Sequence, residues 1–250
     1  MIHFTLIALH GNGGGAFRFA RTAPYMPTHI QFVALTLPGF ADQPVDPRLT
    51  SLRAYAERLL EMLTAYPQPR VLLGHGIGGA VALELVQFAP NSLEGILLHA
   101  PVGARLDQRR FPKLMQPLVM RKLGQWAFSA TLFRPLWRRL LFTTDVPPDY
   151  LAQFFDEYRR CKVFGQMFDL ITAEWFCALQ PVQIPAGLLW GAKERILKVE
   201  QVEDYQSLLP HHIVKIVPDW DHFPMIEQPK EYASTVSTLA SEILQLQKVI

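Results

Sequence analysis

The stretch that most constrains the fold is RVLLGHGIGG at residues 70–79. Its apolar start predicts a buried strand over Arg70–Leu73, and an apolar helix is expected around Val81–Phe88. Gly74 and Gly78 allow the chain to turn sharply between the two without side-chain clashes. A buried strand that enters a helix through a glycine-rich turn predicts an α/β fold.

Such a turn is written G-x-S-x-G in enzymes that raise a serine nucleophile off the end of a sheet. The matching position here is Gly76, and the turn holds no other Ser, Thr or Cys. The nucleophile of an elbow costs roughly 1–3 kcal/mol in backbone strain when it carries a Cβ. Glycine relieves that strain but removes the oxygen that would form an acyl-enzyme. The sequence therefore predicts that serine-type ester hydrolysis is nearly abolished.

Short apolar runs alternate with helical patterns along the rest of the chain. Several runs are continuously apolar, as parallel strands covered on both faces are. Apolar positions with helical spacing recur over residues 52–63 and 236–246. The alternation predicts a mostly parallel sheet flanked by helices, with right-handed crossovers. The strands are expected at His3–Leu9, Gln31–Leu35, Arg70–Leu73, Leu93–His99, Ala186–Trp190 and His212–Val217.

One long stretch breaks this alternation. From about Ala104 to Pro181 the sequence holds several prolines, helical patterns and no convincing strand. We expect it to be a helical lid, inserted over the carboxyl ends of the strands. The chain then divides into one core domain, residues 1–103 and 182–250, and a lid, residues 104–181. A length of 250 residues fits one α/β domain with such an insertion.

The charge is balanced overall but not locally. The formal net charge is +2, which favours no nucleic-acid partner. Between Arg105 and Phe142, however, Asp107 is the only acid, and four aromatic side chains interleave with the bases. A basic, aromatic helical face can rest on an anionic membrane surface or receive an anionic ligand, although a solvated face is the commoner explanation. The bases are Arg105, Arg109, Arg110, Lys113, Arg121, Lys122, Arg134, Arg138 and Arg139.

Cysteine usage and the N-terminus point to a soluble protein of the cytoplasm. Cys161 and Cys177 are too few for a disulfide framework and are expected to be free thiols. The first residues lack a basic segment, and their apolar run is too short for a signal peptide or a membrane span.

Four further motifs surround the elbow in the chain. His10-Gly11-Asn12-Gly13-Gly14 follows the first strand, and Leu37-Pro38-Gly39-Phe40 follows the second. Trp190-Gly191-Ala192-Lys193-Glu194 ends a later strand, and Asp221-His222-Phe223-Pro224 comes near the C-terminus. In this order the motifs resemble the α/β-hydrolase superfamily, in particular its small esterase, C–C hydrolase and thioesterase-like members. The chain departs from that pattern at Gly76 and in entering directly on the strand before the first motif.

The resemblance implies a role for each motif. His222 would be the general base, and Glu194, where the family usually has Asp, would orient it. The backbone N–H groups of Asn12 and Ile77 would form the oxyanion hole. The nucleophile position would be vacant at Gly76.

Three other histidines are candidates for the pocket around these residues. His10 and His75 fit best as structural parts of the family's turns. His99 ends a strand near the same rim and is the third candidate for the pocket. No metal site is expected, because the histidines lack ligand spacing, and no cofactor is expected, because the glycines after the first strand fit an oxyanion loop better than a dinucleotide fingerprint.

Three functions remain open at this stage. The first is altered catalysis, in which His222 activates a water or abstracts a proton from a bound ligand. The second is a non-catalytic pseudo-hydrolase that binds a ligand or a protein partner. The third is a serine esterase whose nucleophile was replaced by engineering. In each, the ligand is expected to be small and largely apolar, with an acyl or carbonyl group.

Overall fold

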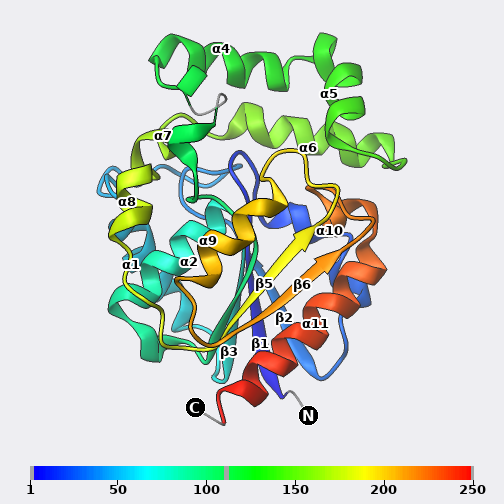
Figure 1. Cartoon of the computed structure of the whole chain (residues 1–250). Helices are drawn as coiled ribbons and strands as arrows, with labels where there is room; N and C mark the ends of the chain where they lie inside the picture. The colour runs from blue at the N-terminus through cyan, green and yellow to red at the C-terminus, as the bar shows by residue number, and fades with distance from the viewer. Residues whose placement is uncertain (1–2, 110–112, 249–250) are drawn as a thin grey trace.

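In the computed structural model, residues 3–109 and 113–248 are described, and they build one six-stranded parallel sheet with helices on both faces (Figure 1). The strand order is β2-β1-β3-β4-β5-β6. This confirms the predicted α/β fold and its parallel sheet. The strands are β1 (Phe4–Leu9), β2 (Ile30–Leu35), β3 (Arg70–Gly76), β4 (Gly95–Pro101), β5 (Ala186–Gly191) and β6 (His212–Val217).

The central strands are buried on both faces, and this explains their continuously apolar sequences. Every residue of β1, β4 and β5 is buried, whereas the edge strands β2 and β6 are partly open to solvent. Strand β3 extends three residues beyond the predicted end at Leu73. The extension arises because His75 still pairs with His99 on β4 before a bulge shifts the register at Gly76.

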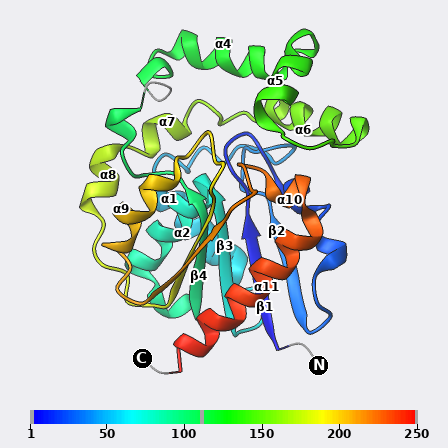
Figure 2. The same ribbon diagram turned by 45° about the vertical axis from the view of Figure 1, so that its right-hand side comes forward.

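Helices α1 (Leu52–Leu63) and α2 (Ile77–Phe88) pack against each other, and α11 (Pro229–Leu246) crosses the opposite face of the sheet (Figure 2). The alternation of side chains along a strand separates these faces. Gly74 lies against α2, since an added Cβ would be 2.6 Å from Gly79 Cα. His99, on the neighbouring strand β4, points to the opposite face, which α11 covers. Its Nδ1 lies 3.1 Å from the hydroxyl group of Tyr232 on α11.

Between β4 and β5 the described residues contain helices and no strand. Most of these helices lie beyond the carboxyl ends of the strands, with α4 and α5 as the outermost layer and α6 beneath them (Figures 1 and 2). Helix α8 lies at the side of the core, where Trp175 donates to Glu84 of α2. We call residues 104–181 the helical segment; its boundaries and its action as a lid stay predictions, and Arg110 lies outside the described residues. Its helices are α4 (Leu118–Ser129), α5 (Arg134–Leu141), α6 (Pro148–Arg160), α7 (Met167–Leu170) and α8 (Ala173–Ala178).

Two short helices complete the core after β5. They are α9 (Val202–Gln206) and α10 (Pro224–Glu227), and α10 directly follows His222 and Phe223. A search of the described helices for one long and apolar enough to cross a bilayer finds none.

Candidate active site

The corner between β3 and α2 is made by a single residue, Gly76. Its backbone has φ 55° and ψ −117°, a conformation that residues with a Cβ rarely adopt. A Cβ added there would have one described neighbour within 4 Å beyond the adjacent residues, Gly11 Cα at 3.3 Å. The predicted tight strand-to-helix corner is therefore present, and a Cβ at its apex would have a single close neighbour.

The loop after β1 packs directly against this corner. The His10 carbonyl accepts the N–H of Gly78 at 3.2 Å, and an added Cβ at Gly11 would lie 3.1 Å from Nδ1 of His75. Ile77 is the first residue of α2, so its N–H has no acceptor within the helix. Asn12 is fixed by its side-chain amide, which donates to the Phe164 carbonyl at 3.1 Å. The two N–H groups expected to form an oxyanion hole thus belong to segments that touch.

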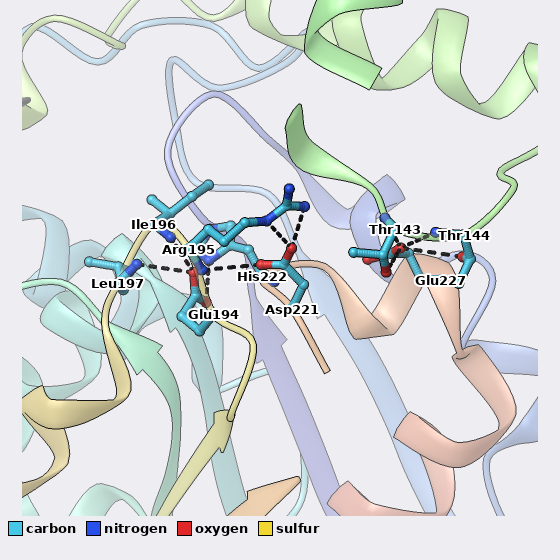
Figure 3. A network of polar contacts seen from close by, with 9 residues as sticks. All are labelled: Thr143, Thr144, Glu194, Arg195, Ile196, Leu197, Asp221, His222 and Glu227. Atoms are coloured by element: carbon cyan, nitrogen blue, oxygen red, sulfur yellow. Dashed lines mark hydrogen bonds and ion pairs between the residues drawn. The ribbon is translucent and has the colours of Figure 1, made fainter. Parts of the chain in front are cut away.

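His222 and Glu194, which come from loops after β6 and β5, meet in the structure (Figure 3). The His222 ring lies 4.7 Å from that of His75, which precedes Gly76. Nδ1 of His222 donates to Oε2 of Glu194 at 2.7 Å, and both side chains are buried. Oε1 of Glu194 accepts the backbone N–H groups of Ile196 at 2.7 Å and Leu197 at 3.0 Å. Nε2 of His222 has no hydrogen-bond partner among the described residues, and it is the nitrogen free to exchange a proton.

The electrostatics of Glu194 follow from these contacts. Burial by itself raises the pKa of a carboxyl group, but the His222 imidazole and the N–H groups of Leu197 and Ile196 outweigh it and hold the pKa of Glu194 below its ordinary value. Glu194 therefore stays charged at neutral pH. A charged acceptor fixes the His222 tautomer and stabilises the imidazolium form.

Contacts of Asp221 hold the loop that carries His222 (Figure 3). The carboxylate of Asp221 accepts the N–H of His222 at 2.8 Å and the N–H of Arg195 at 3.2 Å, and it pairs with the Arg195 guanidinium. Asp221 belongs to the sequence motif around His222, but no pattern in the sequence indicates this positioning role.

A second carboxylate ties this loop to the helical segment. Oε1 of Glu227, on α10, accepts the backbone N–H groups of Thr143 at 2.6 Å and Thr144 at 2.8 Å (Figure 3). Hydroxyl groups on both threonines donate to the same oxygen. The end of α10 is therefore fixed to the segment after α5.

The three other candidate histidines, His10, His75 and His99, are buried. The rings of His75 and His222 have centroids 4.7 Å apart, and those of His75 and His99 are 4.8 Å apart. Burial lowers the pKa of His99 to about 3, the pKa of His75 well below its ordinary value, and the pKa of His10 to about 4. All three are neutral at pH 7.

His10 has a structural role in this arrangement. Its Nε2 accepts the backbone N–H of Leu37 at 3.2 Å, and its Nδ1 lies 2.9 Å from the Gly11 carbonyl. The ring therefore joins the loop after β1 to the loop after β2. The ring of His75 packs against that of His222. His99 lies on the next strand, β4, and is further from the corner.

Aromatic rings pack beside His222 and on the loop after β1. The ring of Phe223 lies 4.5 Å from that of His222, and Phe154 and Phe142 lie 5.1 and 5.6 Å from Phe223. The Tyr158 ring rests on Gly13, where an added Cβ would be 2.2 Å from its Cδ1 and Cε1. Residues of the helical segment thus make an apolar cover for the site.

A buried ion pair connects this cover to the loop after β1. Nε of Arg18 lies 3.0 Å from Oε2 of Glu157 on α6, and both side chains are almost fully buried. The Arg18 guanidinium also stacks 3.5 Å from the centroid of Phe154. Burial raises the pKa of Glu157 even though Arg18 opposes the change. Sequence reasoning missed this pair, because 139 residues separate its members and Glu157 lies in a charged helical pattern.

A cleft of about 750 Å³ lies elsewhere, between the helical segment and the loop after β1. Its lining includes Arg21, Arg134, Val146, Leu151 and Phe155 and contains neither Gly76 nor His222. This cleft is therefore not the pocket that the sequence predicts over the elbow.

Comparison with known proteins identifies the family. The profile of the family described as "Alpha/beta hydrolase family" matches residues 6–235, which is most of the chain. The chain belongs to the α/β-hydrolase family. Its elbow corner, its histidine–carboxylate pair and its loop after β1 lie where the fold of an α/β-hydrolase brings the carboxyl ends of the strands together.

Individual relatives of this α/β-hydrolase are distant. It is similar to the pimeloyl-[acyl-carrier protein] methyl ester esterase of Chromobacterium violaceum, with 22% identity over 93% of this chain and 92% of the esterase. Lipase 1 of Psychrobacter immobilis is 23% identical over 97% of this chain and 78% of the lipase. An epoxide hydrolase mutant from Bacillus megaterium shares the fold, with a TM-score of 0.76, 14% identity and coverage of 96% and 94% of the two chains. The relatives are thus esterase-like and lipase-like hydrolases.

Proposed function

We propose that this α/β-hydrolase cleaves small, apolar carboxylic esters without an acyl-enzyme, by a water that His222 activates above Gly76. The observation that carries the proposal is the intact pair between Nδ1 of His222 and Oε2 of Glu194 at 2.7 Å, with Nε2 of His222 left without a protein partner. A general base oriented by a charged carboxylate suits proton abstraction from water. The glycine corner supplies the space in which a water can stand.

The reaction balances with the residues at hand. Nε2 of His222 takes a proton from the water as its oxygen adds to the carbonyl carbon of the ester. The backbone N–H groups of Asn12 and Ile77 donate to the oxyanion that forms. The imidazolium then gives its proton to the leaving alkoxide as the C–O bond breaks, so that an acid and an alcohol leave and His222 is neutral again.

The class of ligand follows from the cover of the site. Phe223 and Phe142 offer ring surface to an acyl chain beside His222. The charge among the neighbouring rings, that of Arg18 on Phe154, is paired with Glu157. The helical segment would act as a lid, because its Phe142 and Phe154 pack against Phe223 beside His222 and would have to move to admit a ligand. The esterase-like and lipase-like relatives are consistent with an acyl ligand.

A non-catalytic binding function is the second candidate. The bare corner and the closeness of Tyr158 to Gly13 favour it, since a covered apolar space without a nucleophile can hold a ligand and leave it unchanged. In that case the chain would retain an apolar ligand, which extraction and mass spectrometry would reveal.

The test uses p-nitrophenyl esters of increasing acyl length. The wild-type chain is expected to turn over short esters slowly and without a burst of nitrophenolate, because no acyl-enzyme accumulates. His222→Ala is expected to abolish that turnover, and Gly76→Ala, whose methyl group takes the place of the water, is expected to reduce it strongly. Lys230→Ala, a change of an exposed side chain that makes none of the contacts described for the site, is the matched control and should leave the rate unchanged.

Two results would count against the proposal. Turnover that survives His222→Ala at the wild-type rate would mean that the imidazole is not the base. Absence of turnover with every ester, together with a ligand recovered from the purified chain, would favour the binding function.

A further inference from the structure

The outer surface of α4 and α5 exposes apolar side chains to an unusual degree. Eight of the eleven large hydrophobic residues that are exposed in the described chain lie between residues 114 and 140. Their exposed fractions run from 48% at Leu140 to 82% at Leu132. We call this set the outer apolar face: Leu114, Leu118, Val119, Leu123, Trp126, Leu132, Leu136 and Leu140.

Helical spacing groups the members of the outer apolar face on single sides of the two helices. Four of them lie on one side of α4, within an arc of less than half its circumference: Leu118, Val119, Leu123 and Trp126. The buried Arg121 lies outside that arc. Leu136 and Leu140 lie one turn apart on α5. Leu132, just before α5, precedes Leu136 by the same number of residues. Soluble helices usually turn their polar side outward, whereas α4 exposes this apolar arc and buries Arg121. Helix α5 buries Leu141 and still exposes Leu136 and Leu140.

Basic side chains accompany the outer apolar face, and acids are absent from it. Residues 113–144 contain six Lys or Arg and no Asp or Glu. Lys122 lies within the apolar arc of α4, and Arg139 lies beside Leu136 and Leu140 on α5. Neither base has an ion pair among the described residues. Arg138, by contrast, pairs with Asp145.

We propose that the outer apolar face docks on the surface of an anionic lipid bilayer. Leucine and tryptophan side chains enter the region between headgroups and acyl chains, while Lys122, Arg139 and the neighbouring Lys113 contact lipid phosphates. A soluble anion would satisfy the bases but would leave eight apolar side chains in water. A bilayer of anionic lipid satisfies both sets, and this selects it over a soluble anionic ligand.

The arrangement has a consequence for the helical segment. The helices α4 and α5 form the layer furthest from the sheet, and α6, which carries Tyr158 and Glu157, lies between them and the corner (Figure 1). Docking would therefore bring the cover of the site to the lipid surface. This inference does not depend on the catalytic proposal, because it rests on exposure and charge alone.

The experiment is co-flotation of the full chain with vesicles. Vesicles of phosphatidylcholine are compared with vesicles in which phosphatidylglycerol replaces part of that lipid. We expect binding to the anionic vesicles that weakens at high salt, since the Debye length falls to about 3 Å at 1 M. Lys122→Gln and Arg139→Gln should each weaken binding roughly fivefold, whereas Lys230→Gln, a change of an exposed base on α11, should not.

Apolar variants test the other half of the proposal. Val119→Glu and Leu132→Glu change side chains that are mostly exposed, so the fold should survive, and each is expected to lower vesicle binding at least tenfold. Val45→Glu is the matched control, because Val45 is 46% exposed and lies outside the outer apolar face. Brominated lipid should quench the fluorescence of Trp126 on binding, and Trp126→Phe should remove the quenched component.

Two outcomes would overturn the proposal. One is failure of the wild-type chain to float with anionic vesicles at low salt. The other is a dimer in light scattering that Val119→Glu and Leu132→Glu dissociate, since this would assign the face to a second copy of the chain. Rates with soluble esters are measured in parallel, so that loss of docking and loss of catalysis are told apart.

Discussion

Restoring a serine at the corner is the most informative perturbation of this site. In Gly76→Ser the new Cβ would lie 3.3 Å from Gly11 Cα, so the loop after β1 must move by a few tenths of an ångström. A residue with a Cβ at φ 55° is strained by roughly 1–3 kcal/mol. For a chain of this length each kcal/mol lowers Tm by roughly 2–4 °C. The variant should therefore fold with a modestly lower Tm.

The expected gain in rate is much larger than this cost. Removing the serine of a complete catalytic triad lowers turnover on the order of 10⁶-fold. If Glu194 and His222 are aligned with the corner, the reverse change should recover a large part of that factor, on the order of 10³-fold or more. Gly76→Ala is the matched control, since it carries the same strain and no oxygen.

The assay is the release of nitrophenolate from a p-nitrophenyl ester. Gly76→Ser should show a burst of about one equivalent per chain, and intact mass spectrometry should find an acyl group on residue 76. Adding His222→Ala should remove the burst. A folded Gly76→Ser with a Tm like that of Gly76→Ala and no gain in rate would refute the alignment of His222 and Glu194 with the corner.

Three further changes test the surroundings of the site. Burial lowers the pKa of His99 from 6.5 to about 3, so between these pH values the unfolded chain binds a proton at His99 that the folded chain does not. The free energy of unfolding therefore falls as the pH falls through this window. In urea titrations, His99→Gln should reduce the slope of unfolding free energy against pH by about 1.4 kcal/mol per pH unit. Glu157→Gln leaves a buried guanidinium without its partner and should cost about 3–5 kcal/mol in the same measurement, whereas Glu57→Gln, which breaks an exposed pair, should cost less than about 1 kcal/mol. Gly13→Ala places a Cβ 2.2 Å from the Tyr158 ring at φ 77° and should displace that ring, which limited proteolysis of α6 would detect; an unchanged cleavage pattern would contradict the packing described.

The fold was predictable because its signals are local. Each central strand is a short apolar run between turn residues, and burial on both faces makes such runs continuous. The strand ends were less certain. Strand β3 runs on to Gly76 because His75 keeps its pairing with β4, and no local pattern reports a pairing between strands.

The residues that meet at the site were predictable for a different reason. The resemblance of ordered motifs placed His222 and Glu194 near each other, and the structure brings them to 2.7 Å. The cover was not predictable in this way. Arg18 and Glu157 look like ordinary charged residues in their own segments, and only the packing of α6 on the loop after β1 buries them together.

The presence of the His222–Glu194 pair helps to decide between catalysis and ligand binding at the glycine corner. The contacts that hold His222 run to Glu194 and Asp221, and none of them involves residue 76. The pair can therefore persist whatever stands at the corner, so its geometry alone does not indicate serine chemistry. Its cost is the stronger argument, because a buried carboxylate gives up its hydration and is stable only where partners compensate for that loss. A site that only held an apolar ligand would gain from losing the carboxylate of Glu194, whereas a site that takes a proton from water needs it to stabilise the imidazolium.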